Sequence, residues 1–320
     1  MADAPVSPAA AADHPAADHP AADHPAAEHA AARLTYAEAN PLAAALVSSL
    51  ASDRGIRTLV IKGLSLEHHG LRPGHVSADV DVLAEPARFG DLLDAIADAG
   101  WRLRPTTTGD RLMTHHSVTF LNPAWPNDLD IHSTFPGMLA GPEASFEALW
   151  THREQAVFGG FPCWIPDRPS AVVIWALHSL RGSQRQPRHA SELRQLIPVV
   201  TAMPPDEAAR LADRIVDLGA VRPLHVVPEL AALTVGRTAP EVDGSWDAWV
   251  GKVAQAHEAS PWLQVLRDAR PVEWPRLLVT AVWPARRDLL VLDPSAVDTT
   301  LGRVQARLRR IGRLVRRLFG

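Results

Sequence analysis

The pattern of apolar and polar positions predicts alternating helices and strands in the first half of the chain. Apolar residues recur at helical spacing over 36–52 and 86–99, and each segment is followed within three residues by a glycine, which is typical of a helix C-terminus. Shorter helices are expected over 63–70 and 143–152. Alternating or β-branched runs predict strands over 58–61, 76–83, 101–104, 117–121 and 129–133, and two more on either side of Gly159-Gly160.

From residue 166 onward, helical spacing dominates the pattern. The predicted helices cover 169–181, 190–200, 206–218 and 223–232. The last segment, 301–320, has apolar residues three and four apart and seven arginines with no acidic residue, so it is predicted to be a basic amphipathic helix. Three interpretations remain open for it: packing on the helical part, contact with an anionic lipid or RNA surface, and pairing with a partner helix.

This order of elements predicts an α/β (α+β) domain with a small mixed sheet over 34–165, followed by a mainly helical domain over 166–300. Residues 1–33 carry an Ala/Asp/His/Pro repeat with a proline every five residues, and we expect a disordered tail there. Its histidines offer weak transition-metal binding at most, and an unselected repeat expansion is the simpler explanation.

Composition excludes several classes of protein. Apolar residues make up 47% of the 320 residues, enough for a sizeable core, and the single cysteine, Cys163, excludes a disulfide framework and a cysteine-based zinc site. The formal net charge of −4 does not by itself indicate nucleic-acid binding. There is no apolar run near the roughly 18 residues of a membrane helix and no signal-peptide pattern, so we expect a cytoplasmic protein without a transmembrane segment.

Paired carboxylates are the strongest chemical signal. Asp79 and Asp81 share one face of a predicted strand, about 7 Å apart, where their charges repel each other. A divalent cation relieves such repulsion, and hard oxygen ligands suit Mg²⁺. In a second strand, Asp130 and His132 share a face, so Asp130 completes a three-carboxylate site if the two strands are neighbours. Asp128, at the start of that strand, is better explained as a solvated residue.

A lysine-glycine turn precedes the first carboxylate strand. Lys62, one of two lysines in the chain, follows an apolar strand, and Gly63 lets the backbone approach a ligand closely. In this order, the turn and the carboxylates indicate a site for a metal-bound polyphosphate. Each of these residues also has a purely structural interpretation. Asp81 caps the following helix, Lys62 is a surface lysine, and His178 is a core histidine on an apolar helix face.

At these residues the sequence resembles the polymerase-β-like nucleotidyltransferase superfamily, and within it a group of uncharacterised bacterial nucleotidyltransferases. The matching motifs are Ile61-Lys62-Gly63, Asp79-Val80-Asp81-Val82-Leu83, the helix ending at Gly100, and Leu129-Asp130-Ile131-His132. Weaker likenesses are Trp175-Ala176-Leu177-His178, Trp283-Pro284 and the basic helix over 301–318. The resemblance covers roughly residues 36–320.

The resemblance implies a role for each matching residue. Asp79, Asp81 and Asp130 would bind two Mg²⁺ ions, with Asp130 also helping to activate the acceptor hydroxyl. Lys62, Gly63 and Ser65 would contact the phosphates of an NTP. His132 and His75 would lie in the shell around these residues and would not bind the metal themselves. The sequence departs from the family pattern at two places. His75 stands where an arginine is usual, and Lys62-Gly63 replaces a glycine-serine pair.

The expected function is therefore Mg²⁺-dependent transfer of a nucleoside monophosphate from an NTP to an acceptor hydroxyl on a small molecule, a protein or an RNA. Two alternatives remain open. One is a non-catalytic, nucleotide-sensing or partner-binding protein that kept the fold, which the replacement at His75 favours. The other is a toxin-type nucleotidyltransferase that modifies tRNA.

Overall fold

The structure is a computed structural model, and it describes residues 34–106, 116–181, 187–254, 269–286, 288–289 and 299–319. The described residues all belong to one compact unit, 34–320. The predicted tail lies outside the described residues. The predicted division into domains at residues 165 and 166 stays a prediction.

A five-stranded mixed sheet forms the centre of the first half of this unit and confirms the predicted α+β class. Its strands lie in the order β1-β2-β5-β4-β3, and β2 and β5 pair in parallel while the other neighbours are antiparallel. The bounds are β1 Thr58–Ile61, β2 Asp79–Ala84, β3 Arg102–Leu103, β4 Ser117–Leu121 and β5 Asp128–His132. A separate hairpin consists of β6 Glu154–Phe158 and β7 Phe161–Ile165, as predicted around the glycine pair.

The predicted helices form with two differences, and two further helices, Ser245–Ala254 and Trp274–Val282, were not predicted. The segment predicted as one helix over 86–99 begins as a 3₁₀ turn, Pro86–Arg88, before α3. The single helix predicted over 223–232 is wrong: two short helices form instead, because Pro228 lacks an N–H and begins a new helix. The helices not yet bounded are α1 Tyr36–Asp53, α2 Gly63–His68, α3 Phe89–Asp98, α5 Pro142–Thr151, α6 Arg168–Ser179, α7 Pro187–Thr201, α8 Pro205–Asp217, α9 Val221–Leu224, α10 Pro228–Leu233, α11 Ser245–Ala254, α13 Trp274–Val282 and α15 Thr300–Phe319.

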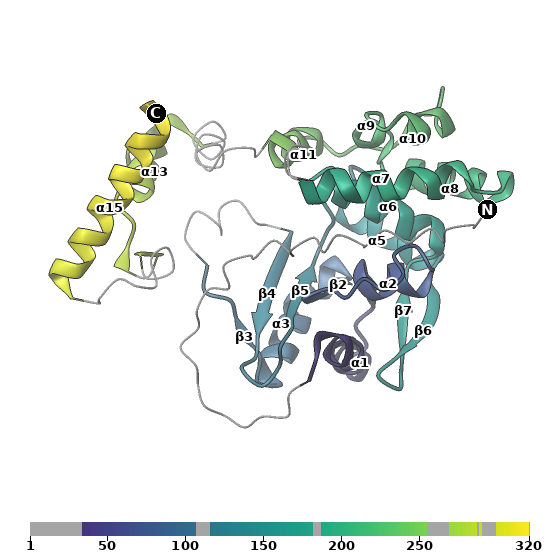
Figure 1. Ribbon diagram of the computed structural model, residues 1–320, viewed down its shortest axis with the longest axis horizontal. Coiled ribbons are helices and arrows are strands. Elements are labelled where there is room, and N and C mark those ends of the chain that lie inside the picture. Colours follow the sequence, from purple (N-terminus) through teal and green to yellow (C-terminus); the bar gives the residue numbers. More distant parts are fainter. Residues whose placement is uncertain are drawn as a thin grey trace, which may run out of the picture. The chain divides into compact units, whose positions relative to one another are not determined.

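Alternation along β1 and β2 divides the core into two apolar clusters, one on each face of the sheet. Val60 and Val82 pack with α1 and α3 on one face. Leu59 and Leu83 pack on the other face with α6 and the helices that follow it. Figure 1 shows α1 below the sheet and α6, α7 and α8 above it. Side chains alternate between the two faces along a strand, so Asp79 and Asp81 lie on the same face as Leu83, which is the face that α6 covers.

The C-terminal helix forms as predicted over Thr300–Phe319. Ala306 is buried against Leu289, and the Arg307 guanidinium lies 4.7 Å from the centre of the Trp283 ring. The exposed Leu308 belongs to the apolar stripe. What this stripe packs against stays a prediction.

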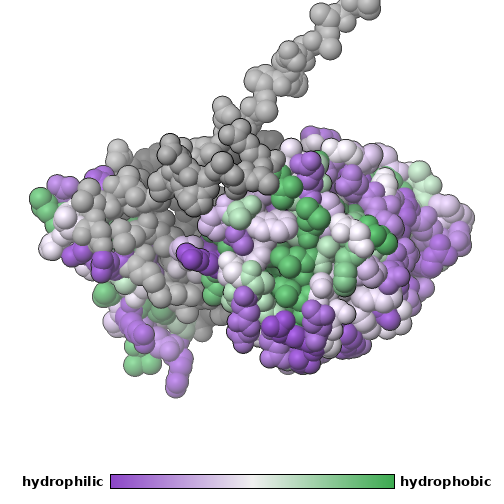
Figure 2. Space-filling model, turned by 90° about the horizontal axis from the view of Figure 1, so that it is seen from below, coloured by the Kyte–Doolittle hydropathy of each residue, from purple (hydrophilic) through white to green (hydrophobic). Residues whose placement is uncertain are grey.

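The surface of the unit is mixed in character. Figure 2, seen from below, shows apolar side chains gathered in a band between hydrophilic ones. The exposed large apolar residues of the unit include Leu42 of α1 and Val157 of β6. Single apolar side chains of this kind are common on protein surfaces. None of the described helices is long and apolar enough to cross a membrane.

We expect Gly219→Ala to destabilise the fold more than Gly236→Ala. Both glycines have positive φ angles, 70° and 72°, so both substitutions carry a similar backbone cost. A Cβ at Gly219 would lie 2.4 Å from the backbone nitrogen of Ala140, whereas a Cβ at Gly236 meets nothing within 4 Å. The overpacking adds about 1–3 kcal/mol, measured as a difference in the free energy of unfolding by urea. Equal losses for the two variants would contradict this close approach.

Candidate active site

A cavity of about 350 Å³ opens on the side of the sheet that α6 covers. Strand residues Asp79, Asp81 and Asp130 lie along one wall of this cavity. The turn between β1 and α2 contributes Lys62 and Gly63. Helices α6 and α7 supply the remaining wall. All three predicted carboxylates therefore face the same cavity.

The parallel pairing of β2 with β5 brings the carboxylates together. Asp81 pairs in register with Asp130, and Asp79 pairs with Asp128. One ligand atom from each of Asp81, Asp130 and His132 lies within 4.8 Å of the others. Asp81 is far from Asp130 and His132 in sequence, so only the strand pairing makes it their neighbour.

Asp81 is the most deeply buried of the three carboxylates, with 3% of the residue exposed. Its Oδ1 lies 2.6 Å from Nζ of Lys62 and 2.8 Å from Nε2 of His132. Burial by itself raises the pKa of Asp81, but the Lys62 ammonium and His132 together hold that pKa well below its usual range. Asp81 is therefore ionised and charge-compensated inside the protein.

The other two carboxylates have different surroundings. Burial, together with the neighbouring charge of Asp81, raises the pKa of Asp79, although Lys62 and a hydrogen bond from Ser77 oppose the rise. Asp130 accepts a hydrogen bond at Oδ1 from Oγ1 of Thr119, at 2.5 Å. A cation bound nearby, or removal of the negative charge of Asp81, would lower the pKa of Asp79 and favour its ionised form.

Lys62 has an unusual backbone conformation. Its φ of 57° is the one positive φ among the non-glycine residues that the structure describes. Such a conformation costs about 1–3 kcal/mol and is found mostly where function or packing requires it. Here the sharp turn between β1 and α2 accompanies the ion pair of Lys62 with Asp81 on the neighbouring strand.

The remaining predicted residues divide into two groups. Gly63, His75 and His132 line the cavity. Ser65 does not line it, because its side chain is fully buried in α2, and the phosphate contact predicted for it stays without geometric support. Asp128, interpreted as a solvated residue at the strand end, forms an ion pair with Arg104 instead of joining the carboxylates.

Most of the wall opposite the carboxylates was not predicted. This wall carries basic and aromatic side chains from α6, the segment directly after it, α7 and the loop before β2: Arg72, Trp175, His178, Arg181 and His189. Burial lowers the pKa of Arg181, and burial with the nearby charges of Lys62 and Arg181 lowers the pKa of His178 to about 2. His178 was interpreted as a core histidine. The clustering of His178, Arg181 and His189 within twelve residues was the signal that could have marked this wall.

The residues fit a divalent cation at the carboxylate wall. Two oxygen donors and one imidazole converge there, and Asp79 adds a carboxylate whose pKa is raised by the charge of its neighbour as well as by burial. Oxygen-rich donor sets suit Mg²⁺. Lys62 satisfies part of the charge of Asp81, so the cation would share that carboxylate with the ammonium.

No protein-family model and no curated protein matches the chain, whereas a comparison with solved structures found several weak matches. The antibiotic-resistance factor ANT(2'')-Ia matches with 14% identity and a TM-score of 0.38, over 60% of this chain and 98% of its own. A nucleotidyltransferase-like protein from Paracoccidioides brasiliensis matches with 12% identity and a TM-score of 0.38, over 63% and 94%. MenT4, a nucleotidyltransferase toxin from Mycobacterium tuberculosis, matches with 14% identity and a TM-score of 0.33, over 77% and 97%. These values are too low to assign an activity to this chain.

We expect His178 to make the fold sensitive to acid. Its pKa is about 2 in the folded protein and about 6.5 in an unfolded chain, so the unfolded chain binds one more proton between these values. Stability then falls as the pH drops below about 6.5, by about 1.5 kcal/mol down to pH 5. The measurement is the free energy of unfolding, with a chelator present, for wild type and His178→Gln.

The exposed His225→Gln is the matched control for this comparison. The His178→Gln variant should lose part of the acid sensitivity, while the control should keep it. Parallel stability curves for wild type and His178→Gln would show that His178 is not held in its neutral form.

Proposed function

We propose that the chain is a Mg²⁺-dependent nucleotidyltransferase that transfers a nucleoside monophosphate from an NTP to an acceptor hydroxyl. One observation carries this proposal. The parallel pairing of β2 with β5 places Asp81 beside Asp130, with Asp79 on the same wall, opposite a wall of basic side chains. A carboxylate wall that holds cations and a basic wall that attracts phosphates are together suited to a metal-bound triphosphate.

The carboxylates have separate tasks in this proposal. Asp79, Asp81 and Asp130 would hold the metal ions, and bound Mg²⁺ supplies charge neutralisation for the reacting phosphoryl group and the leaving pyrophosphate. At Asp130, Thr119 already donates to Oδ1, which leaves Oδ2 to accept the proton of the acceptor hydroxyl. The acceptor oxygen then bonds to the α-phosphorus as the bond between that phosphorus and the pyrophosphate oxygen breaks.

The basic wall would orient the triphosphate. Arg181 is partly buried, and its guanidinium lies 3.1 Å from Nε2 of His116 and 5.4 Å from the centre of the Phe135 ring. A cation held between such neighbours keeps a fixed position, which favours electrostatic stabilisation of developing negative charge. Arg72 lines the same cavity from the loop before β2.

A second candidate function has its own supporting observation. Lys62 and His132 both contact Oδ1 of Asp81, so the buried carboxylate is compensated by protein groups alone. A protein that kept the fold for sensing or binding a nucleotide, without catalysis, would benefit from the same compensation. Binding and turnover experiments separate the two candidates.

We expect calorimetry to detect Mg²⁺-dependent binding of at least one of ATP, GTP, CTP and UTP to the wild type. The Asp79→Asn/Asp81→Asn double variant should lose this binding, because it removes two of the three carboxylates that face the cavity. The single variant Asp79→Asn should weaken it with little loss of stability, since burial already disfavours the charge of Asp79. Asp128→Asn is the matched control, because Asp128 starts the same strand as Asp130 but pairs with Arg104.

Thermal unfolding of each variant shows whether lost binding reflects lost structure. A folded wild type that binds none of the four nucleotides would contradict both candidate functions. Binding that survives in the folded double variant would contradict the carboxylate site.

We expect Asp130→Asn to lower the rate of Mg²⁺-dependent pyrophosphate release by about 10²-fold or more, the size of effect seen when one electrostatic stabiliser is removed. Asp128→Asn should release pyrophosphate at close to the wild-type rate. The assay follows pyrophosphate from the NTP that calorimetry identifies, with candidate acceptors added in turn. Near-normal turnover in Asp130→Asn would contradict the role given to Asp130, and nucleotide binding with no release under any condition would favour the non-catalytic candidate.

A further inference from the structure

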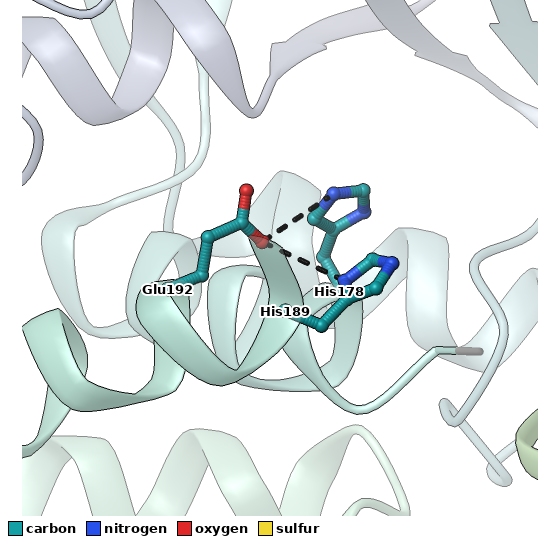
Figure 3. Close-up of side chains that lie close together, drawn as sticks. All are labelled: His178, His189 and Glu192. Carbon is teal, nitrogen blue, oxygen red and sulfur yellow. Dashed lines mark ion pairs between the residues drawn. The ribbon is translucent and has the colours of Figure 1, made fainter. Parts of the chain in front are cut away.

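A second group of metal-ligating side chains lies outside the carboxylate site. It joins the last turn of α6 to the first half of α7: His178 comes from α6, and His189 and Glu192 come from α7. A spacing of three residues places His189 and Glu192 on the same side of α7. Figure 3 shows both imidazoles turned toward the carboxylate of Glu192.

The three side chains meet at one oxygen atom. Nε2 of His178 and Nδ1 of His189 each lie 3.8 Å from Oε2 of Glu192, and the three ligand atoms lie within 4.8 Å of one another. At 3.8 Å these contacts are longer than hydrogen bonds. Zinc ligands about 2.0–2.1 Å from the metal in a tetrahedral site are about 3.3 Å apart, so a modest contraction would bring all three to bonding distance.

The other carboxylate oxygen has a different neighbour. Nη1 of Arg72 lies 3.5 Å from Oε1 of Glu192, so the guanidinium faces one oxygen and the imidazoles face the other. Contacts of this kind to the far side of a ligand orient it toward a metal. The Glu192 side chain is 3% exposed, and a carboxylate buried to this degree is stable only beside cationic or hydrogen-bonding groups.

Neither ring nitrogen of His178 makes a hydrogen bond in this cluster. Its Nδ1 is buried without a hydrogen-bond partner among the described residues, and its Nε2 lies 3.8 Å from Oε2 of Glu192. The positive charges of Lys62 and Arg181 oppose a cation at this place, so the bond energy must come from the ligands themselves. Imidazole nitrogen with one carboxylate favours Zn²⁺ or a similar transition metal over Mg²⁺.

We propose that His178, His189 and Glu192 form a transition-metal site of the Zn²⁺ type in the helical wall of the cavity, distinct from the carboxylate site on the sheet. Three protein ligands leave a fourth position open, as in catalytic rather than structural zinc sites. Both histidines line the cavity, so an open position there meets water or an oxygen of a bound ligand. The proposal does not depend on the proposed function.

The test is Zn²⁺ binding to the metal-stripped full chain. Calorimetry measures the affinity, and elemental analysis measures the number of ions bound. Co²⁺ serves as a second probe, because its visible absorption reports tetrahedral coordination by nitrogen and oxygen. The repeat tail also carries histidines, so the experiment uses a background in which each of them is glutamine: His14, His19, His24 and His29. Mg²⁺ in large excess occupies the carboxylate site during the titration, and we expect one equivalent of Zn²⁺ in this background.

Ligand variants and matched controls decide the assignment. His189→Gln and Glu192→Gln approximately keep the size of the side chain. Each should weaken Zn²⁺ binding by at least about 10–100-fold, because removing a group that only hydrogen-bonds to a metal ligand already has an effect of this size. His225→Gln and Asp130→Asn should bind Zn²⁺ as the background does. Thermal unfolding without metal confirms that each variant is folded.

Each of three results would overturn the proposal. One is the absence of Zn²⁺ binding to the folded background protein. The second is a full equivalent of Zn²⁺ bound with unchanged affinity by both His189→Gln and Glu192→Gln. Loss of Zn²⁺ binding in Asp130→Asn alone would likewise overturn it, because the ion would then belong to the carboxylate site.

Discussion

The buried charge of Asp81 is the constraint around which the site is arranged. A carboxylate removed from water is stable only if nearby groups compensate it. Lys62 reaches it from the end of β1, and His132 reaches it from β5. The strained backbone of Lys62 and the parallel pairing of β2 with β5 both accompany this compensation. The fold therefore holds a negative charge at the base of a cavity, where it is available to a cation.

One face of the sheet is covered by an apolar core, and the other carries the candidate site. On one face, Val80, Val82 and Leu129 pack against α1 and α3 and form an apolar core. On the other face, the same strands present carboxylates at one end and apolar residues at the other. Helix α6 covers that face, with Trp175 buried in the core and His178 lining the cavity. One helix thus closes the core and forms a wall of the site.

The cavity contains two different donor sets close to each other. The sheet presents mainly carboxylate oxygens, which suit hard cations, and the helices present imidazoles with a single carboxylate, which suit transition metals. Each set contains a carboxylate that is paired with a positive side chain: Lys62 contacts Asp81, and Arg72 contacts Glu192. These ion pairs compensate buried negative charge in both sets.

The sequence by itself determined the strands, most helices and the carboxylates, because alternation and helical spacing are local properties of the chain. It placed Asp79 and Asp81 on one strand face and left their pairing with Asp130 conditional on the strand order. Only the tertiary structure decided that β2 lies beside β5, that Ser65 points into the core, and that α6 and α7 bring His178 next to Glu192. These outcomes depend on which elements pack together, and no local pattern carries that information. The basic wall was missed for a related reason: His178, Arg181 and His189 cluster in the sequence, but only the packing of α6 over the sheet shows that they face the carboxylates.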